Sequence, residues 1–200
     1  MGRTVDYYFA PQSPWAYLGH QRLADMVQRH GTTVRVMPID LGGKVFPISG
    51  GLPLGQRAPQ RQAYRLLELQ RFSQYLNVPL NIKPKYFPVG GDDSARLIIA
   101  ADLAQGPQAA MQITGAILAA CWAQERNMAD DKVLAELLQE QNLPVSLMTQ
   151  SRSQAVQVRY ETYTQAAIDV GVFGAPSYVV EGEMFWGQDR LDFVERALAR

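Results

Sequence analysis

The chain has 200 residues, enough for one or two domains with a core that needs no disulfide, and its 19 basic and 19 acidic residues cancel. This balance argues against nucleic acid and anionic membrane surfaces as main partners, and a single cysteine with two histidines argues against an internal disulfide or a typical zinc site. The N-terminus lacks the apolar core of a secretory signal and no apolar run could span a bilayer, so we expect a soluble, cytoplasmic protein.

The beginning of the chain predicts a strand, a helix and a second strand. Residues 5–9 are aromatic and β-prone. Ser13-Pro14 then begins a helix, because the serine hydroxyl can cap the first turn and proline costs nothing at the first helical position. Apolar residues recur at helical spacing as far as Gly31, and residues 34–39 predict the second strand. The Gly- and Pro-rich stretch 41–59 predicts a long loop without regular structure.

The middle of the chain predicts helices and its end predicts a β-hairpin followed by a helix. Helical periodicity covers residues 60–76, 92–104, 108–126, 130–141 and 153–170. Residues 177–180 and 184–186 then predict two strands joined by a turn, and residues 187–189 cap a last helix. This order indicates one α/β domain that carries a helical insertion. Within it, Cys121 is expected to be a buried small hydrophobe, and Trp15 and Trp186 are expected mainly in the core.

Two local features indicate a site for an anionic, peptide-like ligand. Ser13 stands where a loop enters a helix, and the unpaired N–H groups and dipole of a helix N-terminus stabilise an anion such as a thiolate. Pro176 directly precedes a strand, and a cis bond before it would turn the backbone of Ala175 toward a ligand. The plain alternatives are that Ser13 is only a helix cap and that Pro176 is only a turn proline.

Several segments resemble the 2-hydroxychromene-2-carboxylate isomerase family, which is related to the kappa-class glutathione transferases and to DsbA-type proteins. They are residues 9–18, 83–88, 171–176 and 185–191. The resemblance implies a thioredoxin-like domain of residues 1–55 and 170–200, interrupted by an all-helical insertion domain of residues 56–169. It also implies a homodimer, glutathione as a cofactor and a small aromatic carboxylate as the substrate.

The resemblance also implies roles for particular residues. The Ser13 hydroxyl would face the glutathione sulfur, Ala175, before Pro176, would pair with the cysteinyl backbone, and Gln188 and Asp189 would hold the γ-glutamyl end. Candidates for the substrate pocket are Lys83, Lys85, Tyr86 and Trp15, the lysines because they can attract a carboxylate or stay solvated loop cations. Where kappa-like relatives carry an asparagine, this chain has Gly51, which implies that one polar contact to glutathione is either missing or supplied by another residue.

The implied activity is the interconversion of 2-hydroxychromene-2-carboxylate and trans-o-hydroxybenzylidenepyruvate by transient addition of a thiolate, in the degradation of aromatic compounds. Ser13 and Ala16 occupy the two cysteine positions of a C-x-x-C motif, so disulfide exchange by this loop is chemically excluded. A kappa-type transferase or peroxidase acting on another electrophile stays open as an alternative, as does a non-catalytic glutathione-binding protein.

Overall fold

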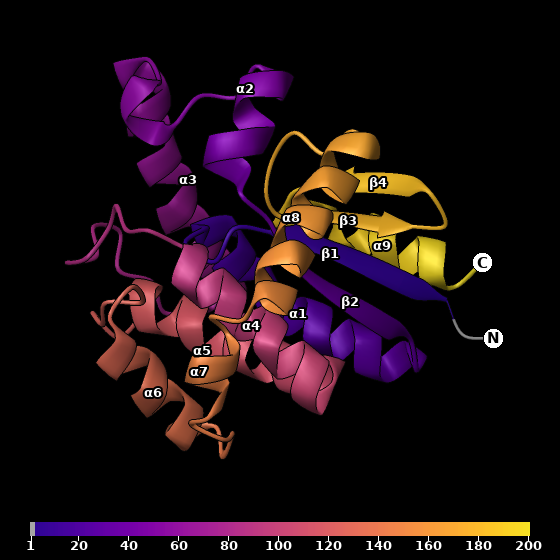
Figure 1. Cartoon of the computed structure of the whole chain (residues 1–200). Coiled ribbons are helices and arrows are strands. Elements are labelled where there is room, and N and C mark those ends of the chain that lie inside the picture. Colours follow the sequence, from indigo (N-terminus) through magenta and orange to yellow (C-terminus); the bar gives the residue numbers. More distant parts are fainter. Residues whose placement is uncertain (1–2) are drawn as a thin grey trace.

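The computed structural model describes residues 3–200, which form a four-stranded mixed sheet surrounded by helices (Figure 1). Across the sheet the strands follow the order β2-β1-β3-β4. In chain order the elements are β1 (Thr4–Phe9), α1 (Pro14–His30), β2 (Thr33–Pro38), η1 (Leu41–Val45), α2 (Phe46–Ser49), η2 (Leu54–Gln56), α3 (Pro59–Leu76), α4 (Asp92–Gln105), α5 (Pro107–Trp122), α6 (Asp131–Glu140), α7 (Leu147–Gln150), α8 (Gln154–Asp169), β3 (Ser177–Val180), β4 (Glu183–Trp186), η3 (Gln188–Arg190) and α9 (Leu191–Leu198).

The central strand β1 determines where the surrounding loops lie. It runs parallel to β2 and antiparallel to β3, with Tyr8 opposite Ser177. Its residues from Val5 to Phe9 are all buried, as expected for a strand with helices on both faces. Because β1 ends where β3 begins, the loop that follows β1 and the loop that precedes β3 lie at the same edge of the sheet.

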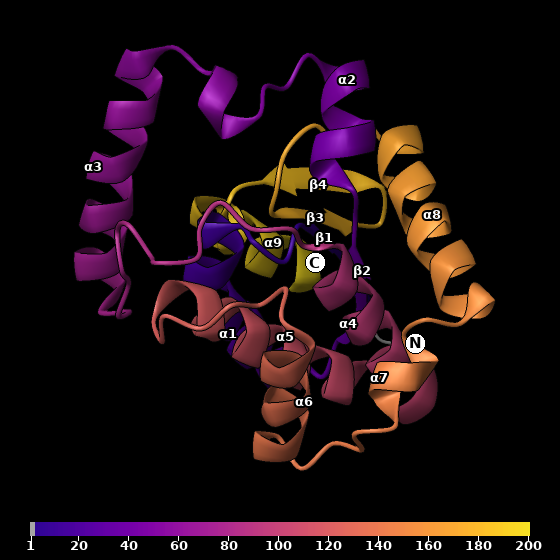
Figure 2. The same ribbon diagram turned by 60° about the vertical axis from the view of Figure 1, so that its left-hand side comes forward.

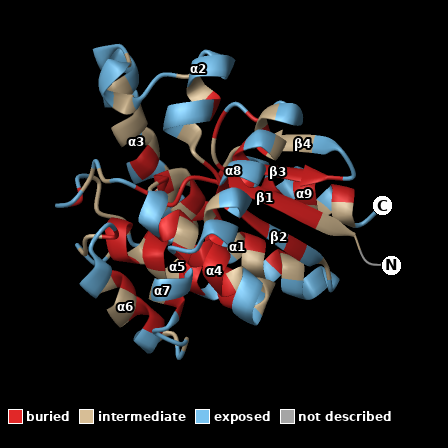
Figure 3. Cartoon of the chain, in the orientation of Figure 1, coloured by how far each residue is buried: buried red, intermediate tan, exposed pale blue. Residues whose placement is uncertain are grey.

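Helices cover both faces of the sheet. α1 packs on the face that carries Tyr7, whose ring centroid lies 6.1 Å from that of His20, and α9 lies beside α1 (Figure 1). α8 covers the opposite face, where the Thr164 hydroxyl accepts a hydrogen bond from the Asp40 N–H at 3.0 Å. α4 and α5 pack against each other and against β2. The buried residues therefore form one continuous core through the sheet and these helices (Figure 3).

The strand–helix–strand beginning and the closing hairpin and helix are confirmed. Pro14 is the first residue of α1, and Gly31 closes the helix in the left-handed conformation (φ 57°) that favours glycine. At the other end, β3 and β4 form the hairpin and α9 follows the short turn η3. The α/β fold with helices inserted between β2 and β3 is the expected one.

The expectation of a structureless loop over residues 41–59 is wrong. This stretch contains a π-helical turn, η1, the one-turn helix α2 and a 3-10 turn, η2. The Asp40 carboxylate accepts a hydrogen bond from the Gly43 N–H at 2.7 Å and caps the first of these turns. Pro47 lies at the start of α2, where a helix needs no N–H. Glycine and proline therefore separate short turns here and do not abolish them.

Two further expectations differ from the structure, and one short helix had no prediction. α5 ends at Trp122, before the expected end at Arg126, because Glu125 adopts a left-handed conformation (φ 54°) that a helix cannot pass through. No periodic signal predicts the one-turn helix α7, whose single buried residue is Leu147. Trp186, expected in the core, is 53% exposed because it lies on the edge strand β4.

The segment from α2 to α3 stands apart from the sheet. Figure 2 shows it as an arch that runs from α2 across to α3. Most of α3 is exposed or half-buried, and Leu69 is its buried residue (Figure 3). The domain boundaries near residues 55 and 170 stay a prediction. Among residues 3–200, every helix is too short or too polar to cross a bilayer.

Candidate active site

Three chain segments meet at the edge of the sheet where β1 ends. The first is the turn that leads into α1, in which the Ser13 N–H donates to the Ala10 carbonyl at 2.9 Å. The second precedes β3 and contains Ala175 and Pro176, next to the end of β1 in the register of the sheet. The third follows β4 and begins at Gly187, whose N–H donates to the Pro176 carbonyl at 2.9 Å. The residues of the expected glutathione site therefore come from one edge.

Ser13 is the N-cap of α1, as its position before Pro14 predicts. Its hydroxyl oxygen accepts a hydrogen bond from the Ala16 N–H at 3.2 Å, and the residue is 8% exposed. This bond uses a lone pair of the oxygen, so the hydroxyl proton stays available to a ligand. The 17-residue helix also directs its positive dipole end to this point. A cap and an anion-stabilising group are therefore compatible roles for the same hydroxyl.

The segment before β3 presents free backbone groups. In the described part of the chain, neither the N–H nor the carbonyl of Ala175 has a hydrogen-bond partner. Its neighbours are fixed, since the Ser177 hydroxyl donates to the Gly174 carbonyl at 2.9 Å and the Pro176 carbonyl accepts from Gly187. The Ala175–Pro176 peptide bond is cis. A rigid segment with an unpaired peptide group can bind an extended peptide backbone.

The turn after β4 places Gln188 and Asp189 differently. The Gln188 side chain is 2% exposed and packs against α1, where Arg22 donates to its Oε1 at 3.0 Å and to its backbone carbonyl at 3.1 Å. Gly19 allows this close approach, because a Cβ at that position would lie 2.8 Å from the Gln188 Cβ. The Asp189 carboxylate is 41% exposed and lies 3.4 Å from the Arg190 guanidinium. Of the two side chains, that of Asp189 is the one accessible to a ligand.

The loop between α3 and α4 passes beside the start of α1. The Tyr17 hydroxyl donates to the Pro79 carbonyl at 2.6 Å, and a Cβ at Gly91 would lie 2.1 Å from the Gln12 Oε1. Three candidate pocket residues of this loop are exposed to solvent: Lys83, Lys85 and Tyr86. The Lys85 ammonium lies 5.0 Å from the centre of the Tyr86 ring. Both lysines are therefore free to meet an anion from solvent.

Trp15, in the first turn of α1, is half-buried. Its ring meets that of Phe72 of α3 edge to face, with the centroids 5.9 Å apart. This contact joins α3 to the first turn of α1, two residues after Ser13. Gly51, at the other end of the arch, has no room for a side chain, because a Cβ there would lie 2.1 Å from the Phe46 ring. An asparagine at this position would require Phe46 to move.

Arg65 of α3 lies over two aromatic rings, although no motif indicates this residue. Its guanidinium carbon lies 5.5 Å from the centre of the Phe87 ring and 5.7 Å from that of Trp122. Burial, together with the nearby positive charge of Arg57, lowers the pKa of Arg65 to about 10. The sequence indicates the region of Arg65 only by a local excess of positive charge: residues 41–91 contain seven basic residues and one acidic residue, Glu68.

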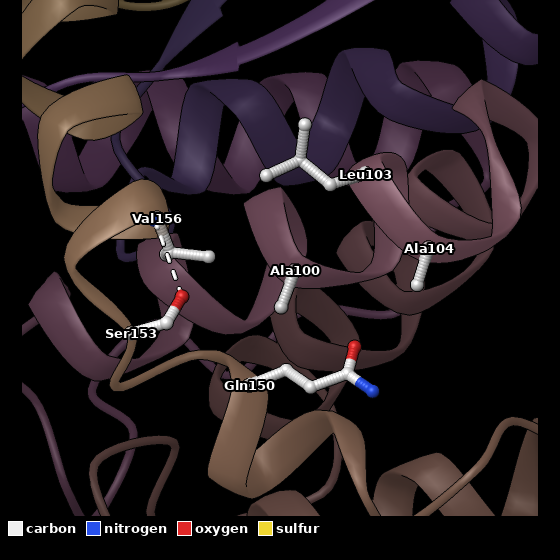
Figure 4. A pocket seen from close by; sticks show the side chains of 6 residues that line it. All are labelled: Ala100, Leu103, Ala104, Gln150, Ser153 and Val156. Carbon is white, nitrogen blue, oxygen red and sulfur yellow. Dashed lines mark hydrogen bonds between the residues drawn. The ribbon is translucent and has the colours of Figure 1, made fainter.

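A separate surface hollow of about 240 Å³ lies between α4, α7 and α8 (Figure 4). Ala100 and Leu103 of α4 and Val156 of α8 give it an apolar lining, and the Ser153 hydroxyl beside it accepts a hydrogen bond from the Val156 N–H at 3.4 Å. None of the expected site residues lines this hollow. Here Ser153 serves as the N-cap of α8.

Cys121, the single cysteine of the sequence, is confirmed as a buried residue of α5. Burial, with a smaller contribution from the charge of Glu125, raises the pKa of its thiol to about 12. A thiol with this pKa is almost fully protonated at neutral pH and is a poor nucleophile. The protein therefore offers no reactive thiol of its own.

Comparisons with known proteins identify the family of the chain. The DSBA-like thioredoxin domain family matches residues 4–199. The 2-hydroxychromene-2-carboxylate isomerase of Pseudomonas putida is 30% identical over 199 residues, which cover 98% of this chain and 94% of that protein. The solved structure of a 2-hydroxychromene-2-carboxylate isomerase superposes with a TM-score of 0.82 at 29% identity, covering 98% of this chain and 95% of the other.

The fold also extends to a protein with different chemistry. The cytosolic disulfide reductase DsbM of Pseudomonas aeruginosa superposes with a TM-score of 0.69 at 20% identity, covering 98% of this chain and 95% of the other. This likeness concerns the fold alone, because Ser13 and Ala16 stand where a C-x-x-C motif would place its thiols. The chain therefore belongs to the DsbA-like thioredoxin family and, within it, to the family of the 2-hydroxychromene-2-carboxylate isomerases.

Proposed function

We propose that this protein is a glutathione-dependent isomerase that interconverts 2-hydroxychromene-2-carboxylate and trans-o-hydroxybenzylidenepyruvate. One observation carries the proposal: the Ser13 hydroxyl, at the N-terminus of α1, shares an edge of the sheet with the unpaired peptide group of Ala175. Two relatives of similar length that carry the isomerase name support the substrate class.

The residues at this edge fit glutathione. The free N–H and carbonyl of Ala175 can pair with the cysteinyl backbone in the manner of an added strand. The exposed Asp189 carboxylate can bind the α-ammonium of the γ-glutamyl residue. With the tripeptide held in this orientation, its cysteinyl sulfur would lie at the Ser13 hydroxyl. Each contact uses a group that the fold leaves available.

The chain supplies orientation and electrostatic stabilisation. Bound glutathione would supply a thiolate that adds reversibly to the conjugated substrate, so that the ring can open and a carbon–carbon bond can rotate before elimination. The Ser13 hydroxyl can donate a hydrogen bond to the sulfur and keep its own proton, and the N-terminal end of α1 adds a favourable field, so both would favour the thiolate over the thiol. Elimination would break the carbon–sulfur bond that addition forms and release the thiolate unchanged, so no oxidant or reductant would be consumed.

The proposal is tested by following turnover of 2-hydroxychromene-2-carboxylate with dialysed protein. We expect activity to depend on added glutathione and S-methylglutathione to inhibit without supporting turnover. Full activity without any thiol would refute glutathione dependence. Conjugation of a chloronitroaromatic or reduction of a hydroperoxide, with the chromene left unchanged, would assign the protein to the kappa-type activities. Binding without turnover of any of these substrates would identify a glutathione-binding protein.

The homodimer implied by the family resemblance stays a proposal. Light scattering should give twice the mass of the 22.3-kDa chain if it forms.

A further inference from the structure

Three arginines of the arch have no acidic partner. In the part of the chain that the structure describes, no aspartate or glutamate pairs within 4 Å with Arg57, which precedes α3, or with Arg61 or Arg65 of α3, whereas Arg71 of α3 pairs with Glu68 at 2.6 Å. The charges of the whole chain cancel, yet the segment 41–91 has a large positive excess. The positive charge of the chain is therefore concentrated in this segment. Within it Glu68 pairs with Arg71 and the Glu125 carboxylate accepts a hydrogen bond from the Lys85 N–H, whereas the three arginines pair with no carboxylate of the described residues.

Arg65 lies in the least favourable surroundings of the three. Its guanidinium is partly withdrawn from water and lies over the rings of Phe87 and Trp122. Aromatic faces attract a guanidinium weakly, but they cannot neutralise its charge. Although its pKa is lowered, Arg65 is fully protonated at neutral pH. A partly desolvated cation beside the like charge of Arg57 is stabilised most by a bound anion.

Two connections link the surroundings of Arg65 to the beginning of α1. Along α3, Arg65 precedes Phe72 by two turns, roughly 10 Å on the helix axis, and Phe72 contacts Trp15. The buried Leu69 lies between them on the same face of the helix. The loop after α3 contacts α1 at Pro79 and the turn before α1 at Gly91. Phe87 lies between these two residues in the sequence.

We propose that Arg65, supported by the charges of Arg57 and Arg61, binds the carboxylate of a ligand held at the Ser13 edge of the sheet. The planar guanidinium can donate two parallel hydrogen bonds to a carboxylate, and the neighbouring Phe87 ring offers an apolar surface for a flat aromatic group. The carboxylate belongs either to the aromatic acid substrate or to the glycyl end of glutathione. This inference rests on the proposed function for the identity of both ligands.

The experiment measures binding by calorimetry with ligands that differ only in charge. Chromone-2-carboxylate is compared with its uncharged carboxamide, and glutathione with its glycyl ethyl ester, on the wild type and on Arg65→Gln. We expect the wild type to prefer one of the charged ligands by about 10- to 100-fold, and Arg65→Gln to lose this preference. Arg71→Gln, which removes a paired arginine from the same helix, should keep it.

The two arms identify the source of the carboxylate. Loss of preference for chromone-2-carboxylate assigns Arg65 to the substrate, and loss of preference for glutathione over its ester assigns it to the tripeptide. If Arg65→Gln discriminates both pairs as the wild type does, or if the wild type prefers neither charged ligand, the inference is overturned. Should Arg65→Gln fail to fold, Arg65→Lys keeps the charge without the planar fork, and it should show a smaller preference than the wild type.

Because binding is measured without turnover, the inference and the proposed function can fail separately. A carboxylate preference that depends on Arg65 in a protein that turns over no chromene would support the site and refute the isomerase. If turnover depends on glutathione but Arg65→Gln keeps the wild-type preference for the charged ligand, the isomerase would be supported and the Arg65 site refuted.

Discussion

Replacing Ser13 by alanine tests whether its hydroxyl stabilises a thiolate. A hydrogen bond to a charged group is worth about 1.5–3 kcal/mol, which corresponds to roughly 1–2 units in the pKa of the thiol. The hydroxyl favours the thiolate and so lowers this pKa, and its removal should raise the pKa by the same amount. At a pH below the wild-type pKa the thiolate fraction, and with it the turnover rate, should fall by about 10- to 100-fold.

The pH dependence of turnover distinguishes this effect from a general loss of function. The rising limb of the Ser13→Ala profile should lie about 1–2 pH units above that of the wild type, and the two rates should converge at high pH, where both thiols are ionised. The ultraviolet absorbance of the thiolate, titrated in the complex with glutathione, gives the same shift without turnover.

The stability of the variant needs a matched control, because Ser13 also caps α1. Loss of the bond from the Ala16 N–H should lower the free energy of unfolding by about 1 kcal/mol and the melting temperature by about 2–4 °C. Ser153→Ala removes the equivalent cap of α8, far from the site, and should have a similar effect on stability. If Ser13→Ala behaves like Ser153→Ala, with an unshifted pH profile, the hydroxyl is only a helix cap.

Three further outcomes are expected. Arg22→Met should weaken glutathione binding several-fold in calorimetry, because the bonds that hold Gln188 and its turn against α1 are lost; unchanged affinity would show that the turn is held in other ways. Burial lowers the pKa of His20 to about 4, so the unfolded chain takes up the proton first, and about 3 kcal/mol of stability should be lost as the pH falls from about 6.5 to about 4. Urea unfolding should show this loss in the wild type and in His30→Gln but not in His20→Leu. Iodoacetamide should modify Cys121 only after denaturation, as mass spectrometry can show, and Cys121→Ala should keep full glutathione-dependent turnover; labelling of the native protein would contradict the burial of its thiol.

The sequence predicted the fold correctly where a single residue determines the local backbone conformation. Ser13 and Pro14 predict the start of α1 because capping and the missing N–H act within a single turn, and Gly31 predicts its end for the same reason. The hairpin of β3 and β4 follows similarly from two short apolar runs around a tight turn. Such features need no knowledge of the rest of the fold.

Tertiary packing decided the positions that the sequence could not predict. Gln188 and Asp189 are neighbours in one motif, yet the first turns inward to Arg22 and Gly19 of α1 and the second faces solvent. No local pattern separates them, because the distinction depends on how α1 crosses the turn. Trp186 is a similar case, since the pattern of a short strand does not say whether it lies at the edge of a sheet.

The net charge of the whole chain does not reveal the local excess of positive charge near the candidate site. A total of zero argues against a polyanionic partner, but it does not exclude a local excess of one sign. Binding one small carboxylate requires a few unpaired cations in one place, and the segment 41–91 provides them while acidic residues elsewhere balance the sum. Which of these cations can act depends on exposure and pairing: Arg71 is satisfied by Glu68, Lys83 and Lys85 are solvated, and Arg65 is half-buried and unpaired. A count of charges by segment indicates the region, and only the packing of α3 beside α1 selects the residue.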